Sequence, residues 1–358
     1  MATRLLNKIR LSRFWIRLTS WEYWPMHVVY TPVYLYWIFL SLRARAFLFF
    51  TGVNPGMDFG GFFGESKKEI LDKIPSEWVP LTLLFPPGTT PEVITQQMKE
   101  SGLSFPVIAK PDVGERGFLV EKIRNESELK SYLAQNPVPV LIQEYVHFPE
   151  EIGVLYYRFP GESSGHISSV TLKKFLSVTG DGTSTVRQLM EVYPRARLQL
   201  PVLEASQPEL LASVPGKEVS VELVPIGNHS RGTTFLNGNH LIDAQLVHTF
   251  DQINSRMEGV FFGRFDIRTK SFEDLKAGKN FKILEVNGVK SEPTHIYEPG
   301  FSIWKAYGVL FRQWTTIYQI SMANKARGFR FPPLRQGIRR MYDTTRYKKQ
   351  AIKSQSYA

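Results

Sequence analysis

The chain has 358 residues, of which 43% are hydrophobic and 22% are charged, with 26 glycines and 23 prolines. This composition is typical of a globular protein and excludes a collagen-like, coiled-coil or wholly disordered chain. The absence of cysteine excludes disulfides, zinc ribbons, iron–sulfur clusters and thiol nucleophiles, and the seven histidines form neither an HExxH motif nor a close pair.

The net charge of +11 is concentrated at the two ends of the sequence. Residues 1–45 carry seven basic residues and one acid, residues 325–358 carry ten basic residues and one acid, and the segment between them has a net charge of −4. A mildly acidic body between basic ends is not typical of a nucleic-acid-binding core. It favours an enzyme whose ends contact an anionic surface, so we expect no nucleic-acid partner and keep an anionic membrane surface as a candidate partner.

Residues 5–18 can form an amphipathic helix. Its apolar side chains share one face and its arginines share the other, with Leu11, Phe14, Trp15 and Leu18 opposite Arg10, Arg13 and Arg17. This pattern fits a helix that lies in a membrane interface. It fits equally a helix that packs on the protein and leaves its arginines in water.

An apolar and aromatic run of nineteen residues spans positions 24–42, close to the ~20 residues that a membrane-spanning helix needs. Pro25 and Pro32 interrupt the run, Trp and Tyr recur throughout it, and arginines flank both sides, so the flanking charges give no orientation. No small-residue cleavage site follows, which excludes a signal peptide. We rank a membrane-surface or re-entrant segment first, a buried helix second and a true span third.

From residue 75 onward, strands and helices alternate. Helices are expected at 91–102, with Thr90 as N-cap and Gly102 as the stop, and at 126–135, with Asn125 as N-cap. Strands are expected at 105–110, 139–145, 168–176, 219–225, 261–268 and 281–286, and the last two should face each other across a polar connection. The pattern predicts an α+β fold with antiparallel sheets.

Two segments in the first half could bind a nucleotide. The strand ending at Lys110 leads into a loop with Gly114 and Gly117, where small residues would let the backbone approach phosphates and the lysine would supply a charge. The segment Gln143-Glu-Tyr-Val146, followed by Glu151, could read an adenine edge and hold ribose hydroxyls. Taken alone, the first segment also fits a plain strand–turn–strand and the second a hairpin edge with solvated acids.

A third group of residues points to a metal site. Asp266 and Glu285 lie in apolar strands, where a carboxylate is costly to bury without partners. Glu285 and Asn287 are two residues apart and share a strand face, which Asp266 on the neighbouring strand could meet. Three hard oxygen ligands suit Mg²⁺. Arg264 shares the face of Asp266 and is placed to stabilise transition-state charge; the alternative is a salt-bridged sheet.

A fourth group combines Leu172-Lys-Lys-Phe175, Gly180-Asp-Gly-Thr-Ser-Thr-Val-Arg-Gln-Leu189 and Asn228-His-Ser-Arg-Gly232. A lysine-bearing strand next to a Gly/Thr/Ser loop could close over a triphosphate, and Asn228 and Arg231 could reach its γ-end or an acyl oxygen. By itself, the Gly180–Leu189 loop also fits any turn before a capped helix.

Taken together and in this order, residues 65–310 resemble the ATP-grasp superfamily of carboxylate–amine ligases. The Asp…Glu-x-Asn triad and the order of the Ala109-Lys-Pro loop and the Glu144-Tyr-Val segment carry the resemblance. The Gly180–Leu189 stretch is similar to the loop of the cyanophycin-synthetase and D-alanine–D-alanine-ligase-like branches, and Asn228–Gly232 is similar to a segment of ribosomal-protein glutamate ligases.

The resemblance implies an ATP-grasp fold, in which two α+β lobes hold ATP, and it implies roles for single residues. The implied nucleotide-binding residues are Lys67 or Lys68, Lys110, Glu144, Tyr145 and Val146 at the adenine, Glu151 at the ribose, Lys173, and Asn228. The implied ligands of two Mg²⁺ ions, for which Mn²⁺ is an alternative, are Asp266, Glu285 and Asn287. The implied catalytic residues are Arg264 at the acyl phosphate, Arg231, and Lys174 as the alternative to Lys173.

The N-terminal part departs from the D-alanine–D-alanine ligases. Gly60, Gly61 and Glu65 mimic a motif of those enzymes, but the 49 residues that separate Gly61 from Lys110 are too few for the usual first domain. We therefore expect a basic, aromatic and membrane-associated region over 1–60, an N-terminal lobe over 61–145, a C-terminal lobe with the metal site over 146–324, and a basic tail over 325–358. The tail could bind anionic lipid, although a solvated, disordered end is favoured.

The resemblance implies an ATP- and Mg²⁺-dependent ligase that joins a small carboxylate to an amine through an acyl phosphate. The expected location is cytoplasmic, with peripheral contact to the inner face of the membrane. Two alternatives stay open: a membrane-surface binding protein that has the fold without the activity, and a ligase that acts on a lipid or cell-envelope precursor.

Overall fold

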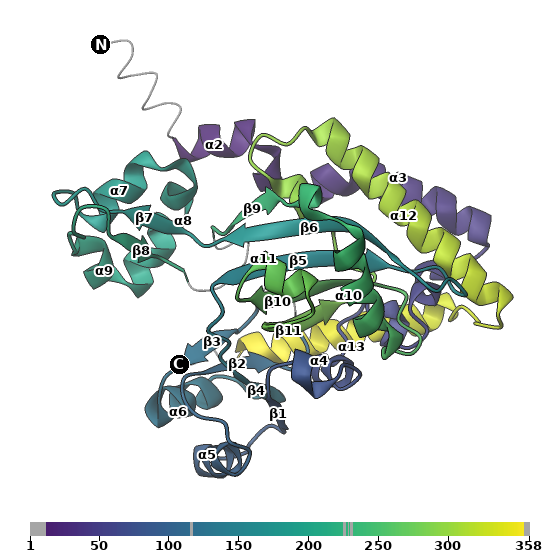
Figure 1. Ribbon diagram of the computed structural model, residues 1–358, viewed down its shortest axis with the longest axis horizontal. Coiled ribbons are helices and arrows are strands. Elements are labelled where there is room, and N and C mark those ends of the chain that lie inside the picture. Colours follow the sequence, from purple (N-terminus) through teal and green to yellow (C-terminus); the bar gives the residue numbers. More distant parts are fainter. Residues whose placement is uncertain (1–11, 115–116, 225–226, 228, 230–231, 354–358) are drawn as a thin grey trace.

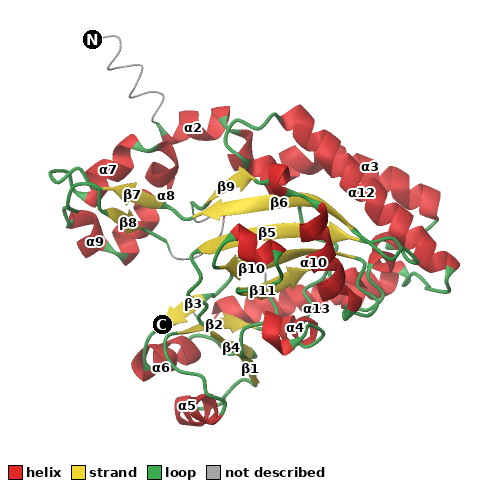
Figure 2. Cartoon of the chain, viewed as in Figure 1, coloured by secondary structure: helices red, strands yellow, loops and turns green. Residues whose placement is uncertain are grey.

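The computed structural model describes residues 12–114, 117–224, 227, 229 and 232–353. Its strands form a four-stranded, a five-stranded and a two-stranded sheet, and every pair of neighbouring strands is antiparallel. The α+β class with antiparallel sheets that the sequence predicts is thereby confirmed. Figure 2 shows the two-stranded sheet at the left of the molecule and the four-stranded sheet below the large sheet.

The four-stranded sheet has the order β1-β4-β2-β3. Its apolar face packs against two helices through Ile94 and Met98 of one and Leu129 and Tyr132 of the other. Both helices lie where the sequence predicts them, and the Asn125 side chain caps the second by accepting a hydrogen bond from Glu128 N at 2.9 Å. The elements are β1 (Thr82–Phe85), α5 (Pro91–Glu100), β2 (Val107–Pro111), β3 (Glu121–Ile123), α6 (Glu126–Ala134) and β4 (Val140–Glu144).

The five-stranded sheet has the order β11-β10-β5-β6-β9 and forms the centre of the molecule (Figure 1). One face packs on α4 and α10 through a buried cluster that includes Ile70, Phe250 and Phe265. A short helix, α11, interrupts the predicted polar connection between the last two strands. The elements are α4 (Lys67–Leu71), β5 (Glu150–Tyr157), β6 (His166–Lys174), β9 (Thr234–Asn237), α10 (Ala244–Ser255), β10 (Phe262–Thr269), α11 (Phe272–Lys276) and β11 (Phe281–Asn287).

The third sheet pairs β7 with β8. It belongs to a small lobe in which three helices share a core with the two strands. Its core includes Leu176, Val186, Met190 and Leu203. Thr185 forms a capping box with Gln188 at the start of the first helix, as a Gly/Thr/Ser loop before a helix would suggest. The elements are β7 (Ser177–Thr179), α7 (Val186–Val192), α8 (Pro194–Ser206), α9 (Pro208–Ala212) and β8 (Ser220–Glu222).

Two long helices, α3 (Met26–Ala44) and α12 (Ile303–Ala326), lie side by side on the other face of the large sheet (Figure 1). They run in the same direction, because Tyr30 packs with Ala306 near their starts and Leu40 with Ile317 near their ends. Between these contacts, the hydroxyls of Tyr36 and Thr315 are 2.7 Å apart. The apolar run at 24–42 is therefore a helix with one packed face, and Pro32 lies within it.

The other face of α3 is open to solvent. Leu35 and Leu42 are each 65% exposed and Phe39 is 50% exposed. Before α3, the short helix α2 (Arg13–Thr19) contains the second half of the predicted amphipathic helix, and residues 1–11 lie outside the described part of the chain. Across the described residues, no helix has both the length and the hydropathy for crossing a membrane.

The basic C-terminal segment corrects one expectation. A disordered tail was favoured, but residues Leu334–Lys353 form a helix, α13, that packs on the body. Arg340 forms an ion pair with Asp58 at 2.7 Å, and the Thr344 hydroxyl donates a hydrogen bond to Phe63 O at 2.6 Å. Near its end, Ala351 completes a small apolar cluster with Leu119 and Val138. The residues that make these contacts are small or polar, whereas the apolar residues that recur at helical spacing, Leu334, Ile338, Met341 and Tyr342, are exposed.

Candidate functional site

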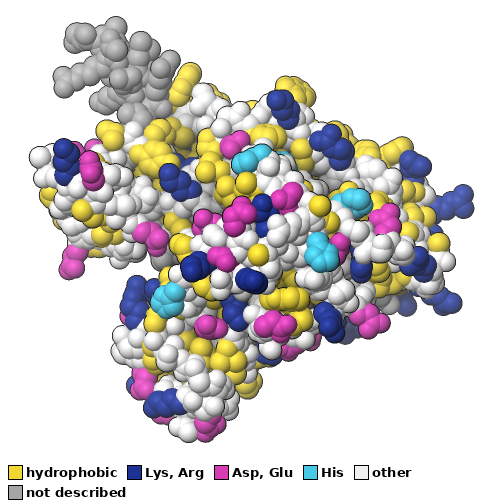
Figure 3. Space-filling model, in the orientation of Figure 1, with side chains coloured by type: hydrophobic (Ala, Val, Ile, Leu, Met, Phe, Trp, Pro, Cys, Tyr) yellow, Lys and Arg dark blue, Asp and Glu magenta, His cyan; other side chains and the backbone are white. Residues whose placement is uncertain are grey.

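One cavity of about 1590 Å³ lies between the two larger sheets and continues between the N-terminal helices and α12. Its walls include most of the site residues that the sequence singled out. In Figure 3 the surface is hollowed between the lobe of α7–α9 and the lobe of α5 and α6. Pockets that bind one drug-sized molecule measure ~300–1000 Å³, so this cavity has room for a nucleotide and a second molecule.

Lys110 and Lys67 form the wall on the side of the four-stranded sheet. Lys110 is 5% exposed, and its ammonium donates to Gln143 Oε1 at 2.9 Å and to Leu284 O, on β11, at 3.2 Å. Burial lowers the pKa of Lys110 to about 8, although Glu285 opposes the shift. Among the described residues, no carboxylate forms an ion pair with Lys110. Its buried ammonium is therefore suited to an anionic ligand.

The sequence could not distinguish Lys67 from Lys68 as the nucleotide-binding lysine, and the structure separates the two. Its ammonium donates to two backbone carbonyls of the Lys110 loop, Asp112 O at 3.2 Å and Gly114 O at 2.7 Å, and it lines the cavity. Lys68 points away and pairs with Asp72 at 2.5 Å. The structure therefore places Lys67, and not Lys68, at the candidate site.

The segment after β4 forms the predicted edge of the cavity. Glu144, Tyr145 and Val146 all line it, and the Lys122 ammonium lies 3.7 Å from the centre of the Tyr145 ring. Glu144 holds the end of β1 by accepting a hydrogen bond from Leu81 N at 3.1 Å. An aromatic ring beside backbone groups of a strand end can pack on a purine.

Glu151 starts β5 and is held by two cations. Its carboxylate contacts Lys173 at 2.9 Å and Arg268 at 3.2 Å, and all three side chains line the cavity. Lys173 and Lys174 point to opposite faces of β6, as neighbours on a strand must. Lys174 is exposed and lies outside the cavity wall, so the structure does not place it among the residues that could act on a bound molecule.

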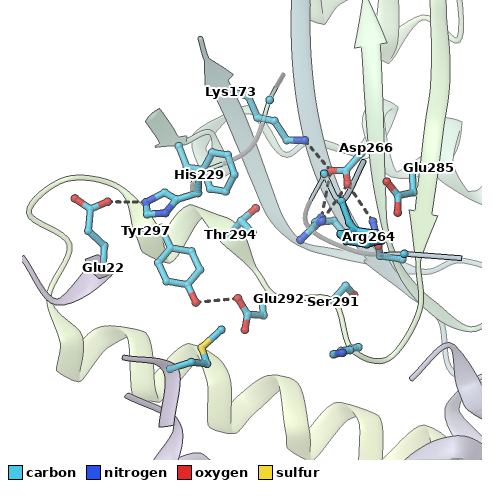
Figure 4. Close-up of a pocket in the computed structure, with 18 of the residues that line it drawn as sticks. Glu22, Lys173, His229, Arg264, Asp266, Glu285, Ser291, Glu292, Thr294 and Tyr297 are labelled. Atoms are coloured by element: carbon cyan, nitrogen blue, oxygen red, sulfur yellow. Dashed lines mark hydrogen bonds and ion pairs between the residues drawn. The ribbon is translucent and has the colours of Figure 1, made fainter. Parts of the chain in front are cut away.

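The centre of the cavity is built around Asp266 (Figure 4). Its carboxylate contacts Arg264 at 3.0 Å and Lys173 at 3.1 Å, and it accepts a hydrogen bond from the Asn287 amide at 3.0 Å. Burial alone would raise the pKa of Asp266, but Arg264 and Lys173 outweigh it and lower the pKa to about 2. Asp266 is therefore ionised at neutral pH.

The register of β10 and β11 brings the predicted metal ligands to one face. Asp266 lies opposite Glu285, and Arg264 lies opposite Asn287. Side chains that face each other on antiparallel strands have Cβ atoms ~4.5–5.5 Å apart, so the two carboxylates and the amide share a small volume. Asn228 and Arg231 lie outside the described residues, and His229 between them lines the same cavity.

The donor set can be tested for its fit to a metal. Among the described residues, no three His, Cys, Asp or Glu side chains form a cluster that could hold a metal ion alone. Asp266, Glu285 and the Asn287 amide oxygen supply hard oxygens on one face, the set that suits Mg²⁺ when phosphate oxygens and water complete its shell. The residues fit a divalent cation that arrives with a phosphate ligand, and fit poorly a resident metal held by protein alone.

The segment that contains Gly60, Gly61 and Glu65 also lies at the cavity. Gly61 has φ +81°, and a Cβ there would meet Gly288 Cα at 2.7 Å, so only glycine lets this turn touch the end of β11. The turn places Glu65 on the cavity wall near Glu285. Burial raises the pKa of Glu65, and Glu285 adds to the shift.

Sequence reasoning missed a second set of polar residues, which line the part of the cavity next to α2 and α3 (Figure 4). The Glu22 carboxylate contacts Arg195 at 2.6 Å and His229 at 2.7 Å. Glu292 accepts hydrogen bonds from Tyr297, at 2.8 Å, and from Tyr30. No local spacing signals these contacts, since the partners of Glu22 and Tyr30 lie more than a hundred residues away in the sequence.

The chain is similar to solved structures, whereas no protein-family model and no curated protein matches it. Similar structures include a bifunctional glutathione synthetase from Pasteurella multocida (17% identity, TM-score 0.36), the VanG D-Ala:D-Ser ligase from Enterococcus faecalis (13%, 0.39) and a D-alanine–D-alanine ligase from Bacillus anthracis (14%, 0.40).

These matches cover 69%, 71% and 74% of this chain and 35%, 61% and 69% of the respective structures. The chain thus spans less than two thirds of the first two proteins. One of the three is named a synthetase and the other two are named ligases. Their TM-scores lie below 0.5, so these structures assign no role to any residue of this chain.

Proposed function

We propose that the protein is an ATP-grasp ligase that uses ATP to join a carboxylate to an amine. The observation that carries the proposal is that Lys67 and Lys110 share one cavity with Asp266, Glu285 and Asn287, which they face across the gap between two sheets. Buried cations on one wall and hard oxygen donors on the other suit the phosphates of a nucleotide and its accompanying cation.

In this proposal the adenine lies against Glu144, Tyr145 and Val146, and Glu151 holds the ribose. Lys67, Lys110 and Lys173 contact phosphate oxygens. Asp266, Glu285 and Asn287 would hold Mg²⁺, which when bound offsets charge on the phosphates. Lys68, Lys174, Asn228 and Arg231 have no support from the described contacts and are left out of this arrangement.

The reaction proceeds in two transfers. An oxygen of the substrate carboxylate attacks the γ-phosphorus while the bond to the ADP oxygen breaks, which gives an acyl phosphate. The nitrogen of the amine then attacks the acyl carbon, and the bond to the phosphate oxygen breaks as phosphate leaves. The amine reaches the site as an ammonium and loses two protons overall, one of which stays on the released phosphate. Catalysis is mainly positioning and charge stabilisation.

Arg264 is the residue best placed to stabilise the acyl phosphate. It lies beside Asp266 and lines the cavity where the nucleotide-binding part meets the part bounded by α3. Burial would lower the pKa of its guanidinium, but the contact with Asp266 outweighs this and raises it. A fixed cation at this position meets the charge that develops on the transferred phosphoryl oxygens.

Nucleotide binding and metal removal test the proposal directly. We expect ATP to raise the melting temperature when Mg²⁺ is present, and we expect EDTA to remove most of that increase, because the phosphates then lack their counter-ion. Differential scanning fluorimetry with ATP, ADP and GTP measures this. In a screen of amino acids and small carboxylic acids, ADP release should require one carboxylate and one amine. A melting temperature that ATP leaves unchanged with Mg²⁺ would rule out the proposed activity.

We further propose that the open face of α3 contacts an anionic membrane surface, so that the enzyme works at a bilayer. Leu35, Phe39 and Leu42 form an exposed apolar row on this helix, and Arg43 and Arg45 follow at its end. Apolar side chains next to arginines are the combination by which a helix lies in a lipid interface. Each basic residue near such a surface contributes about 1 kcal/mol.

Vesicle sedimentation tests this location. We expect the protein to sediment with phosphatidylcholine vesicles that contain phosphatidylglycerol, and to remain largely in the supernatant without the anionic lipid or at high salt. The double variant Leu35→Glu, Phe39→Glu should lose at least about tenfold in binding, since two apolar contacts become charged. The matched control is Val192→Glu, Val202→Glu, which changes two exposed valines of the α7–α9 lobe. Equal loss in both variants would contradict a site on α3.

A further inference from the structure

The cavity extends well beyond the region that a nucleotide would fill. Past Arg264 and Asp266 it continues between α2, the turn at residues 21–25, α3 and α12. We call this part the aromatic arm, and define it by Trp21, Trp24, Val29, Val33, Leu310 and Trp314. The residues that define the arm are apolar or aromatic, whereas the walls around Asp266 are charged, so the two parts of the cavity suit different molecules.

The junction between the two parts carries the carboxylate of Glu292. Glu292 accepts hydrogen bonds from the hydroxyls of Tyr30 and Tyr297, and no ion pair involves it within the described chain. Glu22, in contrast, is neutralised by Arg195 and His229. Two neutral hydroxyl donors leave the negative charge of Glu292 in place, and a partly buried carboxylate gains most from a cation.

Glu292 lies between the aromatic arm and the residues that we place at the reacting groups. Glu292 lies within electrostatic reach of Arg264 and adds to the upward shift of the pKa of that guanidinium. Figure 4 shows Glu292 between the Tyr297 side and the Arg264–Asp266 side of the cavity. An ammonium held by Glu292 is thus next to the residue that we place at the acyl phosphate.

We propose that the aromatic arm binds the amine substrate, and that this substrate is an amphipathic amine whose ammonium group contacts Glu292 and whose apolar body lies along α3 and α12. The identity of the bound molecule as the second substrate rests on the proposed ligase function. The binding itself does not, since the arm and its acceptor are present whether or not ATP reacts. Polar amino acids would leave most of the arm unfilled.

Simple alkylamines test the proposal. Four of the seven tryptophans line the cavity, namely Trp21, Trp24, Trp37 and Trp314, so binding should change the intrinsic fluorescence, and calorimetry gives an independent affinity. We expect n-octylamine to bind at least about 100-fold more tightly than ethylamine, because each methylene that enters the arm leaves water. Octanoate should bind more weakly than octylamine, since it brings a second negative charge to Glu292.

Variants separate the ammonium end from the apolar end. Glu292→Gln should weaken octylamine at least about tenfold and leave n-octanol unaffected, because only the charge is lost. Val33→Trp should block octylamine by filling the arm, and the matched control Leu35→Trp, which enlarges a 65% exposed residue of the same helix, should not. MgATP binding measured on each sample shows whether the variant is folded.

The outcomes distinguish this inference from the ligase proposal. If wild-type protein binds MgATP but binds octylamine no better than ethylamine, or if Glu292→Gln binds octylamine as wild type does, the inference is overturned and the ligase proposal stands. If octylamine binds as expected and MgATP does not bind, the ligase proposal fails and the arm remains an amine site. With both ligands bound, substrate-dependent ADP release should increase with the length of the amine.

Discussion

Replacement of Glu285 by Gln is expected to lower ADP formation by roughly a thousandfold. A divalent cation contributes several kcal/mol to phosphoryl transfer, and each 1.36 kcal/mol is a factor of ten in rate. Glu285 lies directly opposite Asp266 across β10 and β11 and lines the cavity. No ion pair within the described chain involves Glu285, so under the proposed function the isosteric change removes a metal ligand without separating a buried pair.

The measurement is ADP release under saturating MgATP, together with the dependence on Mg²⁺ concentration. We expect the variant to require more Mg²⁺ and to melt within a few degrees of wild type. Glu273→Gln is the matched control, because the side chain of Glu273 is 78% exposed on α11 and lies outside the cavity. A Glu285→Gln enzyme that retains the wild-type rate would show that the metal is held elsewhere.

The second large effect is a pH dependence that arises at Lys110. Burial lowers the pKa of its ammonium from the ordinary 10.5 to about 8. A bound phosphate favours the protonated form, so MgATP binding should be accompanied by proton uptake above pH ~8 and should weaken up to tenfold for each pH unit above it. Calorimetry between pH 6.5 and 9.5 in buffers of different ionisation enthalpy measures both effects.

The lowered pKa of Lys110 also determines whether the free energy of unfolding of the unliganded protein rises or falls with pH. Between pH ~8 and ~10.5 the unfolded chain holds a proton on this lysine that the folded chain has lost, so this group makes the free energy of unfolding rise with pH in that window. Below pH ~8 both states are protonated and the contribution no longer changes. Other groups add their own dependence, so the comparison is made against the variant described next.

Lys110→Gln removes the titrating group and keeps a side chain that can hydrogen-bond to Gln143. We expect MgATP binding to weaken about 10- to 100-fold at pH 7, the value of one charge-assisted contact, and the decline above pH 8 to disappear. Lys122→Gln, in the neighbouring strand β3, is the control, since its ammonium lies on the Tyr145 ring instead. A decline above pH 8 that persists in Lys110→Gln would assign it to another group.

The parts of the site that lie on strands could be predicted from the sequence. Strand alternation puts Glu285 and Asn287 on one face, and it makes only one of Lys173 and Lys174 face the cavity, although it does not say which. The choice depends on how β6 packs in the sheet, which is a tertiary contact. The same holds for Lys67 and Lys68 on the first turn of α4.

The aromatic arm could not be predicted, for a different reason. Its polar end joins Tyr30 to Glu292 and Glu22 to Arg195, and each of these residues looks ordinary in its own segment. The apolar run at 24–42 also gave no sign that one face of α3 would pack on α12, because apolar and aromatic residues surround the helix on all sides. Only the packing of distant segments separates the buried face from the open one.

Helix α13 was not expected because the charge of the segment favoured a disordered tail, and the face through which it packs is not apolar. Gly337, Arg340, Thr344, Tyr347 and Ala351 recur at intervals of three and four residues, which is a helical period, but only Tyr347 and Ala351 have apolar character. Gly337 lets the helix approach Leu48 so closely that a Cβ would lie 2.7 Å from Leu48 Cδ1. The apolar residues Leu334, Ile338, Met341 and Tyr342 also recur at helical spacing, but they are exposed, so the apolar period marks the face that does not pack.

The position of α13 has a consequence for the order of events during synthesis. The helix contacts Asp58 and Phe63 at one end, and Ala351 completes the cluster with Leu119 and Val138 at the other. More than two hundred residues separate Ala351 from Leu119 in the sequence, so this cluster can close only long after Leu119 and Val138 have left the ribosome. The four-stranded sheet emerges early and must wait with part of its surface uncovered, which is the situation in which nascent chains engage chaperones.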